Sequence, residues 1–183
     1  MKVLGIAGSL RSGSLNRELL RRAASAAPAG IELVEWDRLR EVPPYDTDLE
    51  DSDPKPVADL RRAIAEADAV VIATPEYNGS IPGQLKNALD WVSRPDVHRG
   101  PFRGKPVAVV SASTGMFGAM WAAAELKKVL GHMGARVVDA EVTVAKAHER
   151  FDEHDEELVA SLRDTFELLA AEVAENARLT TAA

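Results

Sequence analysis

Residues 8–16, GSLRSGSLN, contain the side chains best suited to bind an anion. Ser9, Ser14 and Asn16 supply neutral hydrogen-bond donors at short intervals. Arg11 adds a forked guanidinium that matches the geometry of phosphate oxygens. The loop also precedes a helical pattern, and a helix N-terminus offers free backbone N–H groups and a positive dipole end. These residue types in this order predict a phosphate-binding loop.

The loop matches neither of two common nucleotide-binding motifs. Gly8 and Gly13 have the spacing of a P-loop, but Ser14 stands where a P-loop needs lysine, which disfavours nucleoside triphosphate hydrolysis. Gly5 and Gly8 do not complete the G-x-G-x-x-G fingerprint of dinucleotide-binding folds. A serine-rich turn with Ser14 as a helix N-cap is the alternative interpretation, and the loop alone does not decide between the two.

A second loop of unusual composition lies within residues 74–94, TPEYNGSIPGQLKNALDWVSR. It follows residues 68–73, DAVVIA, whose apolar run is typical of a strand covered on both faces of a parallel sheet. Leu85, Leu89 and Val92 then recur at helical spacing. The residues of restricted or special conformation between strand and helix are Pro75, Asn78, Gly79, Ser80 and Pro82. Ligands of open α/β sheets bind beyond the carboxyl ends of strands, so this loop is predicted to border a binding site.

The elements that position these loops alternate between strand and helix. Strands are predicted at residues 2–7, 31–36, 68–73, 106–113 and 135–144. Helices are predicted at residues 15–27, 57–67, 83–92 and 155–176, with a further helix that follows the turn TGMFGAM and ends at residue 131. Parallel strands need helical crossovers on both faces of the sheet. The count fits a doubly wound, flavodoxin-like α/β sheet of five parallel strands in the order 2-1-3-4-5.

A single domain of residues 1–176 is expected, followed by a frayed tail of residues 177–183. The length of 183 residues and the 46% hydrophobic content are sufficient for one sizeable core. Residues 37–56 contain four prolines and many acids, and they are predicted to form a long surface loop.

Composition excludes several classes of function. The chain has no cysteine, which excludes disulfides, thiolate nucleophiles and iron–sulfur clusters, and its four histidines lack a spacing suited to zinc. A net charge of -7 argues against nucleic-acid binding. No apolar run is long enough to span a membrane, and the first residues do not resemble a signal peptide, so a cytoplasmic location is expected.

Several further residues have competing interpretations. The acidic cluster Asp46 to Asp51 lacks the glycine and terminal glutamate of a calcium loop, so a solvated loop is predicted. The carboxylate of Glu76 is expected to pair with Arg94 or with a neighbouring chain. Asn87 is expected to bond back to the loop before its helix. His98 is expected to be an exposed loop residue.

Three loops together resemble the NADPH-dependent FMN reductase family, which includes flavin, quinone, azo-dye and chromate reductases. They are GSLRSGSLN, the segment from PEYN to LKNALDW, and SASTGMFG, and the resemblance covers residues 2–144. PPYDTDLE, residues 43–50, also resembles a loop of this family. The resemblance implies a flavodoxin-like fold that binds FMN and passes hydride from NADPH or NADH to a small acceptor in a ping-pong cycle.

The resemblance also implies which residues bind the cofactor. Those that hold the FMN phosphate would be Ser9, Arg11, Ser14, Leu15 and Asn16. Those that line the isoalloxazine ring would be Pro75, Glu76, Tyr77, Asn78 and Gly79, and its other side would be closed by Ser113, Thr114 and Gly115. Because the flavin carries the chemistry, no proton-transfer residue and no metal are expected. Backbone amides of the Asn78–Gly79 or Thr114–Gly115 turn are suited to stabilise the reduced flavin.

Members of this family commonly form homodimers, and many pair again into homotetramers. The expected interface anchors are Trp91, Met116, Phe117, Met120 and Trp121, because aromatic and methionine side chains suit interface cores. Neither nucleic acid nor a membrane is expected as a partner. Two alternatives are a flavodoxin-type electron carrier, whose phosphate loop is usually richer in threonine, and a flavin-free binding domain.

Overall fold

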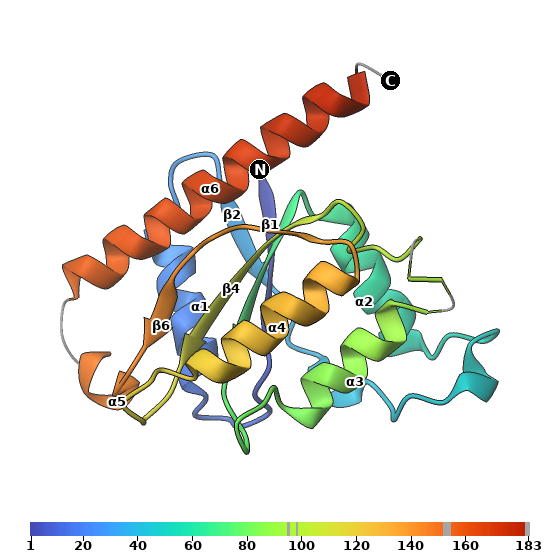
Figure 1. Cartoon of the computed structure of the whole chain (residues 1–183), viewed down its shortest axis with the longest axis horizontal. Coiled ribbons are helices and arrows are strands. Elements are labelled where there is room, and N and C mark those ends of the chain that lie inside the picture. Colours follow the sequence, from blue (N-terminus) through green and yellow to red (C-terminus); the bar gives the residue numbers. More distant parts are fainter. Residues whose placement is uncertain (95, 98, 152–154, 182–183) are drawn as a thin grey trace.

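The computed structural model describes residues 1–94, 96–97, 99–151 and 155–181, and it contains one parallel sheet covered by helices on both faces (Figure 1). The strands are β1 (Lys2–Ala7), β2 (Glu32–Glu35), β3 (Ala69–Thr74), β4 (Pro106–Ala112), β5 (Arg136–Val137) and β6 (Val142–Val144). Their order is β2-β1-β3-β4-β5, and β6 also pairs with β4. The predicted flavodoxin-like order is therefore confirmed.

The helices are α1 (Leu15–Ala26), α2 (Lys55–Glu66), α3 (Gly83–Val92), α4 (Met120–His132), α5 (Ala147–Arg150) and α6 (Glu156–Thr181). Two 3-10 turns, η1 (Leu39–Glu41) and η2 (Thr47–Leu49), lie within the predicted surface loop. α6 continues to Thr181, through residues for which the sequence predicts a frayed tail. None of the described helices is long and apolar enough to cross a membrane.

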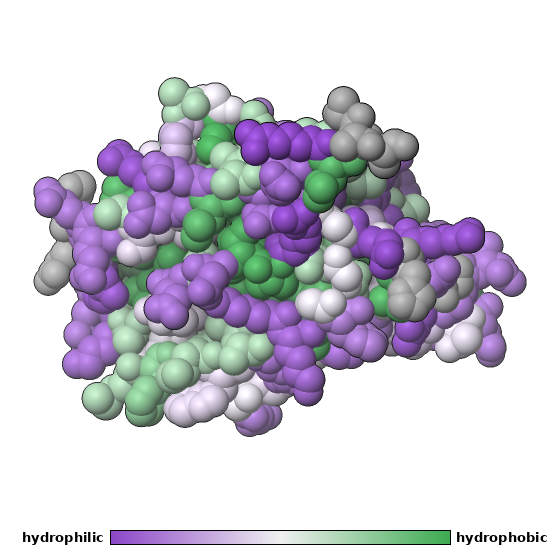
Figure 2. Space-filling model, turned by 45° about the horizontal axis from the view of Figure 1, so that its top comes forward, coloured by the Kyte–Doolittle hydropathy of each residue, from purple (hydrophilic) through white to green (hydrophobic). Residues whose placement is uncertain are grey.

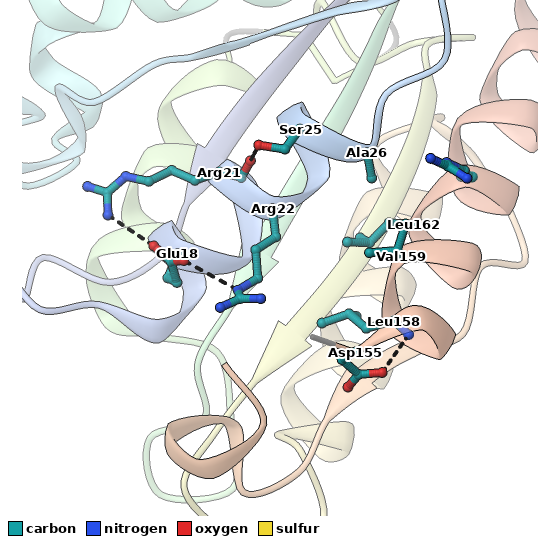
Figure 3. A pocket seen from close by; sticks show the side chains of 10 residues that line it. Glu18, Arg21, Arg22, Ser25, Ala26, Asp155, Leu158, Val159 and Leu162 are labelled. Carbon is teal, nitrogen blue, oxygen red and sulfur yellow. Dashed lines mark hydrogen bonds and ion pairs between the residues drawn. The ribbon is translucent and has the colours of Figure 1, made fainter. Parts of the chain in front are cut away.

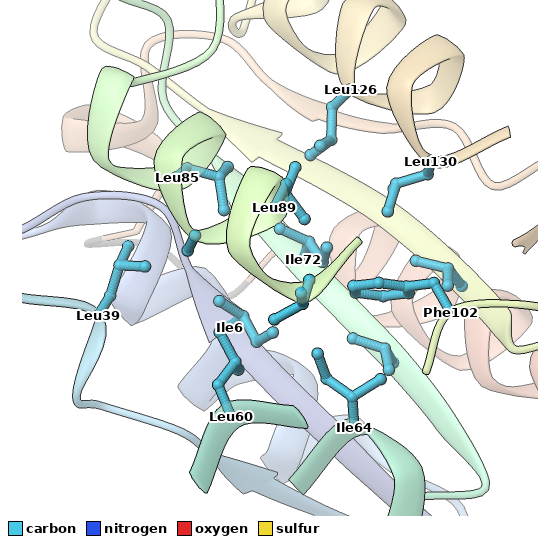
Figure 4. Close-up of a cluster of buried hydrophobic side chains, with 14 of the residues drawn as sticks. Ile6, Leu39, Leu60, Ile64, Ile72, Leu85, Leu89, Phe102, Leu126 and Leu130 are labelled. Atoms are coloured by element: carbon cyan, nitrogen blue, oxygen red, sulfur yellow. The ribbon is translucent and has the colours of Figure 1, made fainter. Parts of the chain in front are cut away.

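The sheet separates two apolar clusters, because successive strand residues point to opposite faces. On one face, side chains such as Ile6 and Ile72 pack against α2, α3 and α4, as Figure 4 shows for Leu60, Leu89 and Leu126. On the other face, strand residues pack against α1 and α6. All residues of β3 and β4 are buried, in agreement with the unbroken apolar runs in the sequence.

The predicted fifth strand is wrong as a single element, because residues 135–144 form two short strands. β5 pairs with Pro106 and Val107 at the start of β4, whereas β6 pairs with residues 110–112 at its end. Between them Val138 and Ala140 are buried, and this interruption separates the two pairings. β6 consequently lies beside the carboxyl end of β4, where a ligand-binding loop begins.

The segment between β2 and α2 is fixed to α3 by side chains of that helix. Asn87 accepts a hydrogen bond from the amide of Tyr45 at 2.7 Å and donates to the carbonyl of Pro43 at 2.8 Å. The indole of Trp91 donates to the same carbonyl at 2.9 Å. The sequence suggested that Asn87 bonds to the loop before its own helix. Its recorded bonds go instead to the segment between β2 and α2. Trp91 is fully buried within the chain, which excludes it as an interface anchor.

Candidate functional site

The carboxyl ends of β1, β3 and β4 lie at one edge of the sheet, and the three loops of interest follow them. A cavity of about 160 Å³ opens at this edge. It is lined by Ser9, Arg11, Gly13, Ser14, Leu15, Asn16, Pro75, Glu76, Tyr77, Ala112, Ser113 and Thr114. Of the residues that the sequence predicts for the site, only Asn78, Gly79 and Gly115 do not line this cavity. Parallel pairing brings the three loops together, since loops far apart in the chain follow neighbouring strands.

The loop after β1 exposes helix amides beside buried hydroxyls. Ser14 is the N-cap of α1, because its side chain accepts from the amide of Arg17 at 3.2 Å and its carbonyl accepts from Glu18 at 3.0 Å. The earlier amides of the first turn, those of Leu15 and Asn16, have no partner within the helix. They point toward the carboxyl edge of the sheet, as the N-terminus of a crossover helix does.

Two buried hydroxyls and one unpaired cation complete this part of the site. Ser9 and Ser14 are only 5% and 6% exposed. Ser9 Oγ accepts from the amide of Arg11 at 3.3 Å and lies 3.4 Å from the hydroxyl of Tyr77. The guanidinium of Arg11 is exposed and has no recorded partner in the part of the chain that the structure describes. This donor set suits a phosphate group, because it combines neutral donors with one cation.

The side chain of Asn16 is bonded to the end of β4. It is 2% exposed, and its amide nitrogen donates to the carbonyl of Ala112 at 2.8 Å. Its amide oxygen accepts from the backbone N–H of the same residue at 3.0 Å. These two bonds use one of the two N–H donors of the carboxamide, and Asn16 also lines the cavity. That Asn16 holds the phosphate stays a prediction.

The loop after β3 contains a two-residue β-hairpin. Tyr77 and Ser80 exchange backbone hydrogen bonds of 3.0 and 3.2 Å. Asn78 and Gly79 between them have φ values of 55° and 74°. Both values are positive, which is the conformation of a type I′ turn and the reason for an Asn-Gly pair at this place. The hairpin agrees with the residues of special conformation that the sequence places between this strand and helix.

Glu76 fixes the loop after β3 to the start of α4. Its carboxylate accepts from the backbone N–H groups of Trp121 and Ala122, both at 3.2 Å. The helix has no capping side chain of its own, because its N-cap residue is Ala119 with a φ of 67°. The sequence suggested Arg94 or a neighbouring chain as the partner. The cap was missed because it comes from a residue 45 positions earlier in the chain.

The loop after β4 is held by β6 and the turn that follows it. The amide of Ser113 donates to the carbonyl of Val144 at 3.1 Å. Ser111, which is fully buried, donates from its hydroxyl to the carbonyl of Gly118 at 2.6 Å. Gly118 has a φ of 58°, and a Cβ atom there would lie 2.9 to 3.0 Å from the backbone of residues 143–145. Glycine is therefore required by both the conformation and the close approach.

Two larger cavities lie away from this edge. One of about 470 Å³ separates α1 from α6 (Figure 3), and one of about 610 Å³ lies between α3 and α4. Several of their charged groups are paired locally: Glu18 bonds to Arg21 and Arg22 in the first, and Lys86 bonds to Asp90 in the second. Neither cavity lies at the carboxyl ends of the strands, so the smaller cavity is the better candidate.

Comparison with known proteins decides the family. The profile of the family described as NADPH-dependent FMN reductase matches residues 1–149. The chain belongs to the NADPH-dependent FMN reductase family. An NAD(P)H-dependent FMN reductase of Pseudomonas aeruginosa is 42% identical over 154 residues, which cover 83% of this chain and 82% of that protein. A quinone reductase of Escherichia coli K12 is 39% identical over 142 residues, with coverage of 76% and 74%.

Solved structures agree with this assignment. FerB from Paracoccus denitrificans, a flavoenzyme NAD(P)H:(acceptor) oxidoreductase, is 31% identical with a TM-score of 0.81. The match covers 93% of this chain and 98% of that one. As a member of the FMN reductase family, the chain is a flavin-dependent oxidoreductase.

The residues at the edge of the sheet fit FMN. The amides of the first turn of α1, the hydroxyls of Ser9 and Ser14 and the guanidinium of Arg11 match the needs of its phosphate. No group of three or more His, Cys, Asp or Glu that could hold a metal occurs among the described residues. Asp46 instead accepts from the amide of Asp48 at 3.0 Å. His98 lies outside the described residues.

Proposed function

We propose that the chain catalyses the NAD(P)H-dependent reduction of a quinone-type acceptor, with FMN as the bound cofactor. FMN supplies the hydride and electron transfer chemistry when bound, so the protein has to place the ring and leave one face accessible. The observation that carries the proposal is the meeting of three loops with complementary donors at the carboxyl edge of the sheet. The quinone reductase among its relatives supports the class of acceptor.

In this proposal the loop after β1 binds the phosphate. The amides of Leu15 and Asn16 and the hydroxyls of Ser9 and Ser14 donate to phosphate oxygens. Arg11 closes the site from the solvent side, where its guanidinium can pair with the phosphate charge. Burial of the two hydroxyls strengthens these hydrogen bonds, because water competes with them less.

The ring would lie against Pro75, Tyr77 and the Asn78–Gly79 hairpin. The hairpin amides between Tyr77 and Ser80 are held by a rigid turn and make no recorded hydrogen bond within the described residues. Such amides stabilise a charge that develops on a ligand without reorganising. On the opposite side, Gly115 already donates to the hydroxyl of Ser113 at 3.2 Å, so the amide of Thr114 is the one available there.

The assembly is proposed to be a homodimer, and the support is an exposed apolar patch at the start of α4. The patch consists of Met116, Phe117, Met120 and Trp121, which are 75%, 58%, 47% and 51% exposed. Apolar residues gather near the lower left of Figure 2, on the side where α4 begins. Phe117 and Trp121 contact each other edge to face, with ring centroids 5.0 Å apart. Large apolar patches of this kind are typical of interfaces between proteins.

Sedimentation velocity tests the dimer. The unmodified protein is expected to sediment as a dimer and the Trp121→Glu variant as a monomer. Leu168→Glu is the matched control, because Leu168 is 41% exposed but lies on α6 and belongs to no such patch. A monomeric unmodified protein would contradict the proposal, and a species of four chains would support the tetramer expected for many relatives. A cytoplasmic location stays a prediction and agrees with a requirement for NAD(P)H.

Anaerobic absorbance spectroscopy tests the function as a whole. The protein is mixed with FMN, separated from free flavin, and treated first with NADPH or NADH and then with a quinone. Bleaching of the flavin band by the nucleotide and its return with the quinone are expected. Bound flavin that neither nucleotide bleaches would indicate an electron carrier of the flavodoxin type. The absence of bound flavin would overturn the proposal.

A further inference from the structure

Asn16 connects two of the three loops that form the proposed flavin site. It belongs to the first turn of α1, whereas its partner Ala112 is the last residue of β4 and directly precedes Ser113 and Thr114. β1 and β4 are not neighbours, because β3 lies between them. Asn16 reaches the end of β4 from the helix, because α1 packs across both β3 and β4.

The carboxamide of Asn16 bonds to β4 one residue beyond the last registered pair with β3. The last registered pair of β3 and β4 is Thr74 with Ser111, and the chain then continues to Pro75, which has no N–H. Ala112, one position further along β4, pairs with Val144 of β6, and its N–H and its carbonyl are both bonded to Asn16. A carboxamide can donate and accept at the same time, as a peptide group does, whereas aspartate lacks the donor and leucine lacks both.

The other loop contacts do not make this connection. Gly8 donates from its amide to the carbonyl of Ala73 in β3 at 2.8 Å, and the hydroxyl of Ser9 lies 3.4 Å from that of Tyr77. Both contacts join the loop after β1 to β3 and to the loop that follows β3. The loop after β4 is held from the opposite side by β6. Among the recorded hydrogen bonds of the described residues, those between Asn16 and Ala112 alone join the phosphate loop to the end of β4.

We infer that the side chain of Asn16 is a positioning residue that fixes the separation between the phosphate-binding loop and the loop after β4 around the ring. This inference rests on the proposed FMN site. It separates two roles that a residue in the phosphate loop can have. A phosphate ligand contributes only to ligands that carry phosphate, whereas a positioning residue contributes to every ligand that uses both loops.

Riboflavin distinguishes these roles, because it has the ring and ribityl chain of FMN but no phosphate. The experiment titrates FMN and riboflavin into the apo-protein and follows the quenching of flavin fluorescence. For Asn16→Ala, the affinities for both flavins are expected to fall by a similar factor, about tenfold, which corresponds to the loss of about one net hydrogen bond. The ratio of the two affinities should therefore stay unchanged.

Arg11→Ala is the contrasting variant in the same measurement. Its side chain is exposed and makes no recorded hydrogen bond to the loop after β4 among the described residues, so the variant should weaken FMN binding and leave riboflavin binding as it is. If Asn16→Ala behaves like Arg11→Ala, and weakens FMN alone, the side chain is a phosphate ligand and the inference is wrong. Unchanged affinity for both flavins would overturn it equally.

Two further variants separate positioning from general loss of stability. Thr165→Val removes a buried hydroxyl that donates to the carbonyl of Ser161 within α6, away from the site, and it should leave both affinities unchanged. Asn16→Gln keeps the donor and the acceptor but lengthens the link by one methylene group. It is expected to fold and bind both flavins, with a visible absorption band displaced from that of the unmodified complex. An unmoved band with full affinity would contradict a positioning role.

Asn16→Ser covers the case in which Asn16→Ala does not fold, because a hydroxyl and a water molecule can then satisfy Ala112. The same similar loss for FMN and riboflavin is expected. Failure of the unmodified protein to bind either flavin would be a different result, since it would overturn the proposed function itself.

Discussion

Replacement of Glu76 by alanine should weaken the attachment between the loop after β3 and α4. The carboxylate accepts two hydrogen bonds from backbone amides at the start of the helix, at 3.2 Å each. In the alanine variant the amides of Trp121 and Ala122 lose this partner, and no side chain at Ala119 replaces it. A negative charge is also removed from the positive end of the helix dipole.

The magnitude follows from the geometry of this cap. Removal of an N-cap side chain costs about 0.5–2 kcal/mol. Both bonds are longer than the 2.7–2.9 Å that is typical of charged pairs, and the amide of Trp121 is near solvent, so the lower half of this range applies. We expect a loss of about 1 kcal/mol in the free energy of unfolding, which corresponds to a fall of roughly 2–4 °C in Tm for a protein of this size.

Urea unfolding of the flavin-free protein measures this loss, and thermal unfolding checks it. Glu76→Gln should lose less than Glu76→Ala, because the amide oxygen still accepts a hydrogen bond but carries no charge. Glu167→Ala is the matched control, since Glu167 is exposed on α6 and has no recorded partner among the described residues. Equal stability of Glu76→Ala and Glu167→Ala would refute the assignment of Glu76 as the cap of α4.

Three further outcomes are expected. Arg11→Ala should weaken FMN binding by about 1.5–3 kcal/mol, the range for hydrogen bonds to charged groups, and unchanged affinity in a fluorescence titration would remove Arg11 from the phosphate site. Asn78→Ala, at a φ of 55°, should alter the affinity or reduction potential of bound FMN more than Asp48→Ala does, and equal effects would count against the hairpin. Hydrogen bonds from Lys55 and Arg38 lower the pKa of Asp59 from 3.8 to about 2. The contribution of Asp59 to stability is therefore complete above pH 3.8 and is lost as the pH falls toward 2. In Asp59→Asn, the free energy of unfolding measured with urea should fall less steeply over this pH range. An unaltered pH dependence would contradict the pairing.

Periodicity was sufficient to predict most of the fold. The apolar runs of β3 and β4 are buried on both faces, and the helical spacing of Leu85, Leu89 and Val92 corresponds to α3. The division of residues 135–144 was not predictable in this way. Val138 and Ala140 are apolar and buried like strand residues, and only the two separate pairings with β4 reveal that the strand is interrupted.

The site was predictable where its features are local. The Asn78–Gly79 turn, the N-cap at Ser14 and the exposed amides of α1 depend on residues within four positions of one another. The partners of Asn16 and Glu76 lie 96 and 45 positions away. No spacing in the sequence could indicate them, because their distance along the chain has no relation to their distance in the sheet.

These two long-range contacts connect the loops of the site to other elements of the fold. A loop that is fixed only at its ends keeps much conformational freedom, and ordering it on ligand binding costs about 1–2 kcal/mol for each residue. Asn16 additionally joins the loop after β1 to β4, and Glu76 joins the loop after β3 to α4. Both bonds join groups of the chain itself, so neither requires a flavin as a partner. The amides at the site are therefore ordered by folding, and binding energy from the phosphate and ring is not needed to arrange them.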